Sequence, residues 1–346
     1  MKRHLLRDEV AAVIERREAA RGIPTFLCKW WGDGTEEKYG QELQEVASRY
    51  PDDIFDAWVT MPGSVESTTD NPEYRFGFKE NYSEAAVHSI GKDVELLDDW
   101  DDFEEFLASF PDPHEPGIFD HMEQNVSEVD GRYKLGGFWR VFHERFWTIR
   151  GMENLMIDYY EEMDNLKILG QRLVDFYKVI VDRYAELGFD GIFTSDDLGH
   201  QTGPMMSPQV FEELYLPLYK ELISHIHSKG MHFWLHSCGD NSLLMDYLIE
   251  AGLDVFHPVQ KGCMDRKETA EKFGGKITFL CGIDVQHLMP EGSPDDVRAE
   301  IGQMRETFGR PDGGMMFAAG NGIMPDTPLK NIEAMLEAVV SDREDV

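Results

Sequence analysis

The sequence predicts an α/β fold in which a single (β/α)8 (TIM) barrel accounts for the chain. Three observations lead to this prediction: a length of 346 residues, short apolar segments that alternate with amphipathic helical segments, and about eight strand candidates. Near-continuous apolar strands separated by helices indicate a parallel sheet that is covered on both faces. Eight such strands favour a closed barrel over an open, doubly wound sheet.

The predicted strands are short apolar runs, and the predicted helices begin at turn or acidic residues. The first half contains three strand candidates, and the second half contains five: residues 24–30, 53–61, 134–142, 189–195, 231–237, 253–259, 277–283 and 314–320. Helices are predicted between and after the later strands, at residues 207–228, 241–251, 265–273, 294–308 and 327–340.

The remaining sequence predicts additions to the barrel. Residues 1–22 are typical of an amphipathic helical extension, and acidic side chains at Glu9, Glu15 and Glu18 argue against an export signal. Residues 63–129 show little periodicity, so we expect insertions and a lid there. Because no long linker or low-complexity segment occurs, residues 1–346 are predicted to form one domain.

Acidic residues greatly outnumber basic ones, 66 against 33, and the formal net charge is −33. Such a charge repels polyanions, so we expect neither nucleic acid nor a membrane surface as a partner. The four cysteines form no C-x-x-C pair, and without an export signal they predict a reducing, cytoplasmic location. A monomer and a homodimer are both compatible with the sequence.

A histidine and a cysteine two positions apart suggest a metal site in FWLHSCGDN, residues 233–241. Residues two apart in a strand point to the same side, so His236 and Cys238 can converge on one ion. Zinc favours imidazole and thiolate ligands, and barrel active sites lie at the carboxyl ends of the strands. Cys281, at the end of another predicted strand, is the expected third ligand. Alternatively, His236 and Cys238 simply end an ordinary buried strand.

Other polar residues follow predicted strands at the same edge of the barrel. Asp196 and Asp197 come directly after one strand, with His200 close behind. These three are candidate catalytic groups that bind substrate or move protons, although Asp197 could instead cap the turn. Gln260 and Asn321 follow two further strands, and we expect them to line the substrate pocket.

Five segments in succession resemble the uroporphyrinogen decarboxylase superfamily: FDGIFTSDDLG, HSCGDN, AGLDVFHPVQ, CGIDVQHLMPEGSPDDVRAEI and AAGNGIMPDTPLKNIEAM. The resemblance covers residues 138–340 well and the N-terminal third weakly. It implies a distorted (β/α)8 barrel with N-terminal and inserted segments. It also implies one of two chemistries: cofactor-free decarboxylation of tetrapyrrole acetate groups, or zinc-dependent methyl transfer between a corrinoid protein and a small acceptor, often a thiol.

The chain departs from the decarboxylase pattern near its N-terminus. Members with that activity carry an arginine-rich R-Q-A-G-R segment that holds the substrate carboxylates. The corresponding segment here, FLCKWWGDG at residues 26–34, contains no arginine, and AWVTMPG at residues 57–63 lacks the aspartate that follows. The methyltransferase branch is therefore the better resemblance.

The resemblance to the methyltransferases is incomplete at one position. Their H-x-C motif matches His236 and Cys238, but their third zinc ligand, a cysteine in G-C-G, corresponds to Asn321. An amide is a poor zinc ligand compared with a thiolate. The third ligand is then Cys281, or a carboxylate of the Asp196–Asp197 pair, or else the metal is held weakly or is absent.

Together, the residues and the resemblance predict a zinc-dependent methyltransferase that acts with a corrinoid protein and a small-molecule substrate or thiol. Two alternatives stay open. One is a metal-free decarboxylase or lyase that acts on a smaller acid and uses Asp196 or Asp197 as its acid–base group. The other is a non-catalytic barrel that binds a tetrapyrrole or a corrinoid.

Overall fold

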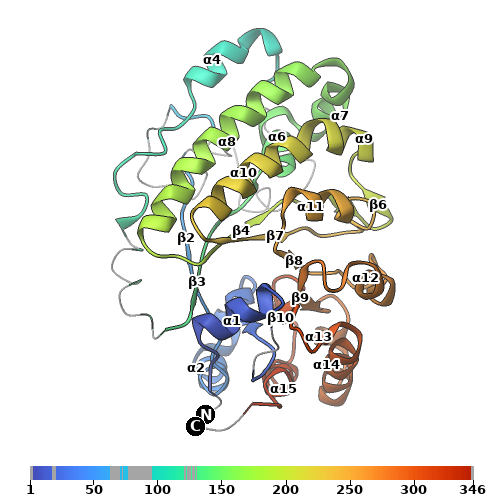
Figure 1. The fold of residues 1–346 in the computed structure, drawn as a ribbon. Coiled ribbons are helices and arrows are strands. Elements are labelled where there is room, and N and C mark those ends of the chain that lie inside the picture. The colour runs from blue at the N-terminus through green and yellow to red at the C-terminus, as the bar shows by residue number, and fades with distance from the viewer. Residues whose placement is uncertain are drawn as a thin grey trace.

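Eight parallel strands form the centre of the molecule, as the sequence predicts (Figure 1). The computed structural model describes residues 3–17, 21–62, 71, 73–76, 96–120, 122, 126, 129 and 131–343. The strands, in their order around the sheet, are β1 (Thr25–Phe26), β10 (Met315–Ala319), β9 (Thr278–Ile283), β8 (Val255–His257), β7 (His232–His236), β4 (Gly191–Ser195), β3 (Tyr133–Phe138) and β2 (Ile54–Trp58). Each of the eight predicted segments overlaps one of them, and each observed strand is shorter than its predicted segment; β3 begins one residue before the predicted start.

The sheet curves into a nearly closed barrel, and two aspartates bridge the seam between its first and last strands. The backbone N–H of Asp53 donates to the Thr25 carbonyl over 3.2 Å, and the Asp53 carboxylate accepts from the Thr25 N–H at 2.7 Å. Asp52 accepts from the backbone N–H groups of Leu27 and Cys28 at 2.8 and 2.7 Å. At this seam, aspartate side chains therefore accept hydrogen bonds that a ladder of backbone hydrogen bonds between paired strands would otherwise form. The prediction of a (β/α)8 barrel, and not a doubly wound sheet, is confirmed.

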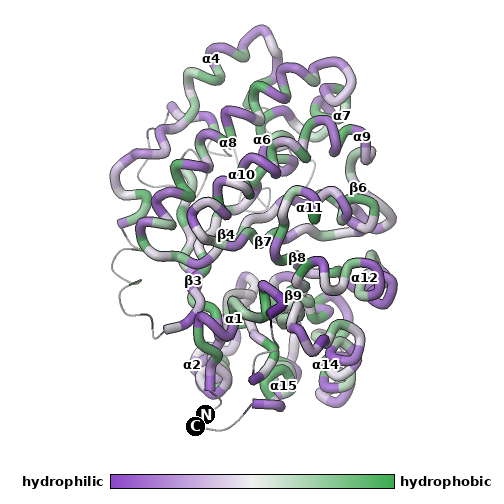
Figure 2. The backbone as a smooth tube through the Cα atoms, viewed as in Figure 1, coloured by the Kyte–Doolittle hydropathy of each residue, from purple (hydrophilic) through white to green (hydrophobic). Residues whose placement is uncertain are grey.

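Helices surround the barrel and turn one apolar face toward it, so polar and apolar residues alternate along them (Figure 2). The helices are α1 (Arg7–Ile14), α2 (Thr35–Ala47), α4 (Phe103–Ala108), α6 (His143–Arg150), α7 (Met152–Glu161), α8 (Met163–Glu186), α9 (Pro208–Val210), α10 (Leu216–Ser228), α11 (Met245–Ala251), α12 (Arg266–Phe273), α13 (Leu288–Glu291), α14 (Pro294–Phe308) and α15 (Leu329–Val339). No helix among the described residues has the length and apolar character that a membrane span requires.

The predicted helix at residues 207–228 is present but is not one regular α-helix. A π-helical turn, Phe211–Tyr215, lies between α9 and α10. Pro217, in the first turn of α10, has no N–H to donate to the preceding turn, which accounts for the change of helical pitch. The predicted N-terminal helix is α1, and it begins several residues into the chain.

Most of the predicted insertion region, residues 63–129, lies outside the described residues. Within its described part, the chain forms a short 3-10 turn, Trp100–Asp102, and the helix α4. The carboxyl ends of β4 and β7 lie side by side, because Ser195 pairs with His236 in the sheet. This edge of the barrel carries the candidate site.

Candidate metal centre and substrate cavity

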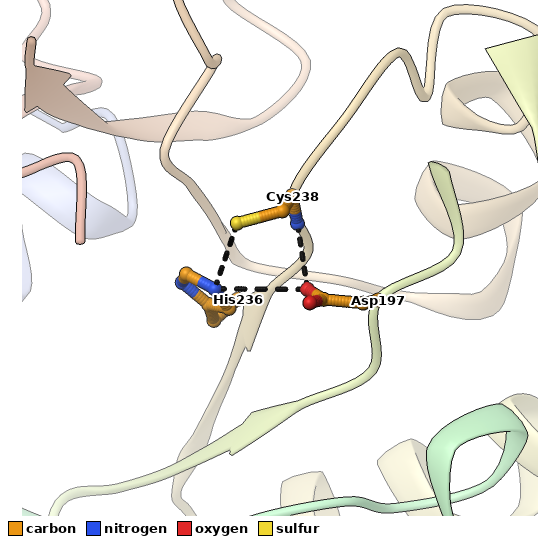
Figure 3. A group of neighbouring side chains, drawn as sticks. All are labelled: Asp197, His236 and Cys238. Atoms are coloured by element: carbon orange, nitrogen blue, oxygen red, sulfur yellow. Dashed lines mark hydrogen bonds and ion pairs between the residues drawn. The ribbon is translucent and has the colours of Figure 1, made fainter. Parts of the chain in front are cut away.

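Three side chains with metal-binding atoms meet at the carboxyl ends of β4 and β7 (Figure 3). His236 is the last residue of β7, Cys238 follows two positions later, and Asp197 lies just after β4. Their ligand atoms all lie within 4.8 Å of one another. The backbone N–H of Cys238 also donates to Asp197 Oδ1 at 2.8 Å, so the aspartate fixes the loop that carries the thiol.

The spacing of these atoms suits a tetrahedral ion. His236 Nε2 lies 3.3 Å from Cys238 Sγ and 3.7 Å from Asp197 Oδ1. Zinc bonds of about 2.0–2.3 Å to nitrogen, oxygen and sulfur place neighbouring ligand atoms roughly 3.4–3.6 Å apart. One nitrogen, one thiol sulfur and one carboxylate oxygen make up a donor set that fits zinc, and three protein ligands leave one position open.

Cys281, the expected third ligand, is not part of this group. It lies on β9 two residues after Phe279, whose ring packs against Phe308 of helix α14 at 5.3 Å. Because residues two apart in a strand point to the same side, Cys281 faces the helical layer and not the barrel interior. Its thiol is buried there, and burial raises its pKa to about 12. The structure brings Asp197 to His236 and Cys238 in its place.

Asp196 and Asp197 are adjacent in sequence but have different surroundings. Asp196 is fully buried and accepts from the backbone N–H groups of His143 and Glu144 at 3.0 and 2.8 Å, and from the Tyr219 hydroxyl at 2.6 Å. It therefore caps the start of helix α6, and burial raises its pKa to about 6. The Asp197 side chain is 29% exposed to solvent and lines the cavity described next.

A cavity of about 280 Å³ opens beside Asp197 and Cys238. The predicted residues His200, Gln260 and Asn321 all line it. Apolar and aromatic side chains complete one part of its wall: Trp147, Met205, Ile283 and Val285. The size and the mixture of apolar walls with a few polar groups are typical of a site for a small ligand.

Gln260 and Asn321 also contact the Cys238 loop. Gln260 Oε1 accepts from the Gly239 N–H at 2.7 Å, and the Asn321 amide group lies 3.7 Å from Cys238 Sγ, within reach of a hydrogen bond to sulfur. Gly239 has φ of +82°, and a Cβ there would lie 2.3 Å from the backbone of Gly199. A side chain at this position would push the thiol-bearing loop away from the loop after β4.

Glu144 is a buried acidic residue near the candidate ligands. The pattern of polar residues at strand ends does not reveal it, because it lies on helix α6. The Ser195 hydroxyl donates to Glu144 Oε2. Burial, followed by the charges of Asp197 and Asp196, raises the Glu144 pKa to about 8. The sequence feature that could have indicated it is an acidic residue inside the aromatic-rich segment FWRVFHERFW, residues 138–147; in the structure every residue of α6 is buried. Glu144 is therefore a carboxyl group that holds a proton near neutral pH.

Burial also affects the candidate ligands themselves. It lowers the pKa of His236, although the nearby Asp197 opposes this change, so the imidazole is neutral and can bind an ion. Burial and the Asp197 charge raise the pKa of the Cys238 thiol well above its usual value. A bound divalent cation reverses that effect and holds the sulfur as thiolate.

Comparison with known proteins agrees with this fold. Residues 82–341 match the family described as uroporphyrinogen decarboxylase (URO-D). The chain belongs to this family. A methyltransferase from Methanosarcina mazei has a similar solved structure, with a TM-score of 0.66 at 16% identity over 98% of this chain and 99% of that one. At that identity the likeness concerns the fold.

Curated relatives include both activities found in the family. A methylated-thiol–coenzyme M methyltransferase from Methanosarcina mazei is 25% identical over 194 residues, which span 55% of this chain and 48% of that protein. A uroporphyrinogen decarboxylase from Syntrophotalea carbinolica is 23% identical over 248 residues, which span 69% of this chain and 68% of that enzyme. The match to the first relative thus spans about half of its length.

Proposed function

We propose that this chain is a zinc-dependent methyltransferase that moves a methyl group between a corrinoid protein and a small molecule or thiol. The observation that carries the proposal is the group of Asp197, His236 and Cys238 at the edge of a small cavity. Catalytic zinc sites commonly have three protein ligands and one position open to substrate. The similarity to a methylated-thiol–coenzyme M methyltransferase supports this choice of reaction.

Zinc held by these three residues would supply a Lewis acid, which keeps an acceptor thiol in its nucleophilic thiolate form or polarises a methyl donor. The protein's own groups then position the reactants. Asp197 and Gln260 hold the Cys238 loop through its backbone N–H groups, and Asn321 directs an amide toward Cys238 Sγ. His200 lines the same cavity and offers a hydrogen bond to a bound substrate.

The cavity favours a small substrate over a tetrapyrrole. Its volume of about 280 Å³ lies at the lower limit of pockets that enclose ligands of drug size. A macrocycle with eight carboxylate side chains also needs cationic partners. Among the described lining residues the one lysine, Lys261, already pairs with Glu300 at 2.9 Å. A decarboxylase that acts on a tetrapyrrole, or a tetrapyrrole-binding barrel, therefore has less support from this site than methyl transfer.

The first experiment measures the metal content of protein purified without a histidine tag, using plasma mass spectrometry. We expect about one zinc per chain, lost in His236→Ala and in Cys238→Ala. Cys281→Ala is the matched control, because it removes a thiol that faces the helical layer, and it should keep its zinc. Equal loss from the Cys281 variant, or a wild-type protein that takes up no zinc, would contradict the proposed ligand set.

The second experiment tests the reaction with methylcobalamin as a soluble probe. In anaerobic buffer with a small thiol, the cobalt–carbon bond breaks and a sulfur–carbon bond forms. The products are the methyl thioether, cob(I)alamin and one proton, so the visible spectrum of the corrinoid reports turnover. We expect demethylation with wild-type protein and none with Cys238→Ala. Zinc-loaded protein that leaves the probe methylated with every thiol tried, while it releases carbon dioxide from small carboxylic acids, would favour the lyase alternative.

A further inference from the structure

A second histidine lies directly behind the candidate ligand His236. His257 ends β8 and pairs with His236 in the sheet, and none of its surface is exposed. The Nδ1 atoms of the two rings are 2.7 Å apart. His257 Nε2 lies 2.8 Å from the backbone carbonyl oxygen of Ala319 on β10. Both nitrogens of His257 therefore have hydrogen-bond partners inside the barrel.

The partners determine where the protons lie. A carbonyl oxygen only accepts, so His257 Nε2 carries a hydrogen and donates it to Ala319. His257 is fully buried, and no carboxylate among the described residues makes a hydrogen bond or ion pair with it, so its ring is neutral and its Nδ1 is an acceptor. The single hydrogen between the two Nδ1 atoms then belongs to His236.

We propose that His257 is a positioning residue that holds His236 in the Nδ1–H tautomer and so directs the Nε2 lone pair toward Cys238 and Asp197. The distances agree, because His236 Nε2 is the atom 3.3 Å from Cys238 Sγ and 3.7 Å from Asp197 Oδ1. In the opposite tautomer, an N–H group would occupy the position that an ion needs. This role rests on the proposed metal site.

The surrounding rings keep His257 in place. Trp30 stacks on it, with ring centroids 4.7 Å apart and an angle of 24° between the planes. The indole N–H of Trp30 donates to the Phe26 carbonyl at 3.0 Å, which fixes the tryptophan in turn. His257 is thus packed against a fixed aromatic ring and tied to two other strands. His236, which hydrogen-bonds to this fixed residue, therefore keeps its orientation whether or not an ion is bound. This lowers the free-energy cost of binding an ion.

Two variants separate the hydrogen bond from simple packing. His257→Gln supplies an acceptor oxygen for His236 Nδ1 and an N–H donor for Ala319, whereas His257→Leu fills the space with neither. Zinc affinity is measured by competition with a chromophoric chelator at one fixed pH. We expect His257→Gln to remain within a few-fold of wild type and His257→Leu to bind about 10–100-fold more weakly, the usual loss for a partner of a metal-bound histidine. Wild-type affinity in a folded His257→Leu protein would overturn the proposal.

Nitrogen NMR of metal-free wild-type protein tests the tautomer without any variant of His257. With 15N-labelled histidine, and with His236→Ala to assign the signals, we expect a protonated Nδ1 and an unprotonated Nε2 at His236. A protonated Nε2 would refute the proposal even if the protein binds zinc. Conversely, the predicted tautomer in a protein that binds no zinc would support the role of His257 and reject the metal site. The two proposals can therefore fail separately.

Discussion

Asp196 and Asp197 offer a matched pair of substitutions, since the same chemical change at neighbouring positions should have opposite effects. In Asp197→Asn, the remaining amide oxygen still accepts from the Cys238 N–H, so the loop stays in place. The anionic ligand of the ion is lost, however. Loss of a residue that only orients a ligand costs about 10–100-fold in metal affinity, and we expect loss of the ligand itself to cost about 100-fold or more.

Asp196→Asn should instead lower the stability of the fold. The two oxygens of Asp196 accept three hydrogen bonds, from His143, Glu144 and Tyr219, and the Asn side chain has only one oxygen. At least one buried backbone N–H at the start of α6 then faces an NH2 group. An unsatisfied buried donor costs about 1–3 kcal/mol. With an unfolding entropy of about 2.1 cal/mol/K per residue over 346 residues, that corresponds to a fall in the melting temperature of roughly 1–4 °C.

The assay combines zinc affinity with thermal unfolding followed by circular dichroism, on both variants and the wild type. The expected result is a crossed pattern: Asp197→Asn loses zinc and keeps its melting temperature in the metal-free state, and Asp196→Asn does the reverse. If Asp196→Asn lost zinc while Asp197→Asn kept it, the assignment of the two carboxylates would be refuted. A parallel loss of both properties in both variants would also refute it.

Three further predictions follow from particular contacts. The Glu144 pKa is raised from 4.5 to about 8, so its stabilising contribution is complete below pH 4.5 and is lost as the pH rises through 8. Urea unfolding across this range should therefore show that the free energy of unfolding falls as the pH rises. In Glu144→Gln this dependence on pH should be absent. Arg343→Met leaves the fully buried Asp53 without its partner at 2.6 Å, which should cost about 3–5 kcal/mol in the free energy of unfolding. Arg310→Met, in an exposed ion pair, is the control and should cost less than about 1 kcal/mol, and equal losses would contradict the argument. Asn321→Cys places a thiol near Cys238 Sγ. Zinc affinity should rise, and methyl transfer should fall because the new ligand closes the open position of the ion. An unchanged zinc affinity would argue against an ion beside Cys238.

The barrel was predictable because its strands are short, buried on both faces and separated by helices. Segments such as residues 277–283 and 314–320 are apolar almost throughout, which is typical of parallel strands, and β9 and β10 lie within them. The irregular α9–α10 region was not predicted, since an apolar helical pattern alone does not show how the chain adjusts to Pro217. The seam between β1 and β2 depends on side-chain acceptors, which periodicity does not detect.

The candidate site was only partly predictable. Two residues of a strand end two positions apart must share a side, so His236 and Cys238 could be paired from sequence alone. The choice among Cys281, Asp196 and Asp197 for the third position could not be made that way, because it depends on the phase of β9 and on which aspartate caps α6. Glu144 lies on a helix, and only packing brings it near strands β4 and β7.

By itself, the sequence determined the order of the strands along the chain and of the helices that follow residue 207, the edge of the barrel that gathers polar residues, and the H-x-C pair, since all of these follow from local periodicity and fixed chain geometry. The helices α2, α6, α7 and α8 were not predicted. Tertiary structure alone decided that Asp197 joins the pair, that Asp196 serves helix α6, and that Cys281 faces away. It also placed His257 behind His236, in hydrogen-bonding contact with a carbonyl on β10. The physical reason is that ligand sets and tautomers depend on distances of a few ångströms between atoms of different strands, and those distances exist only once the barrel has closed.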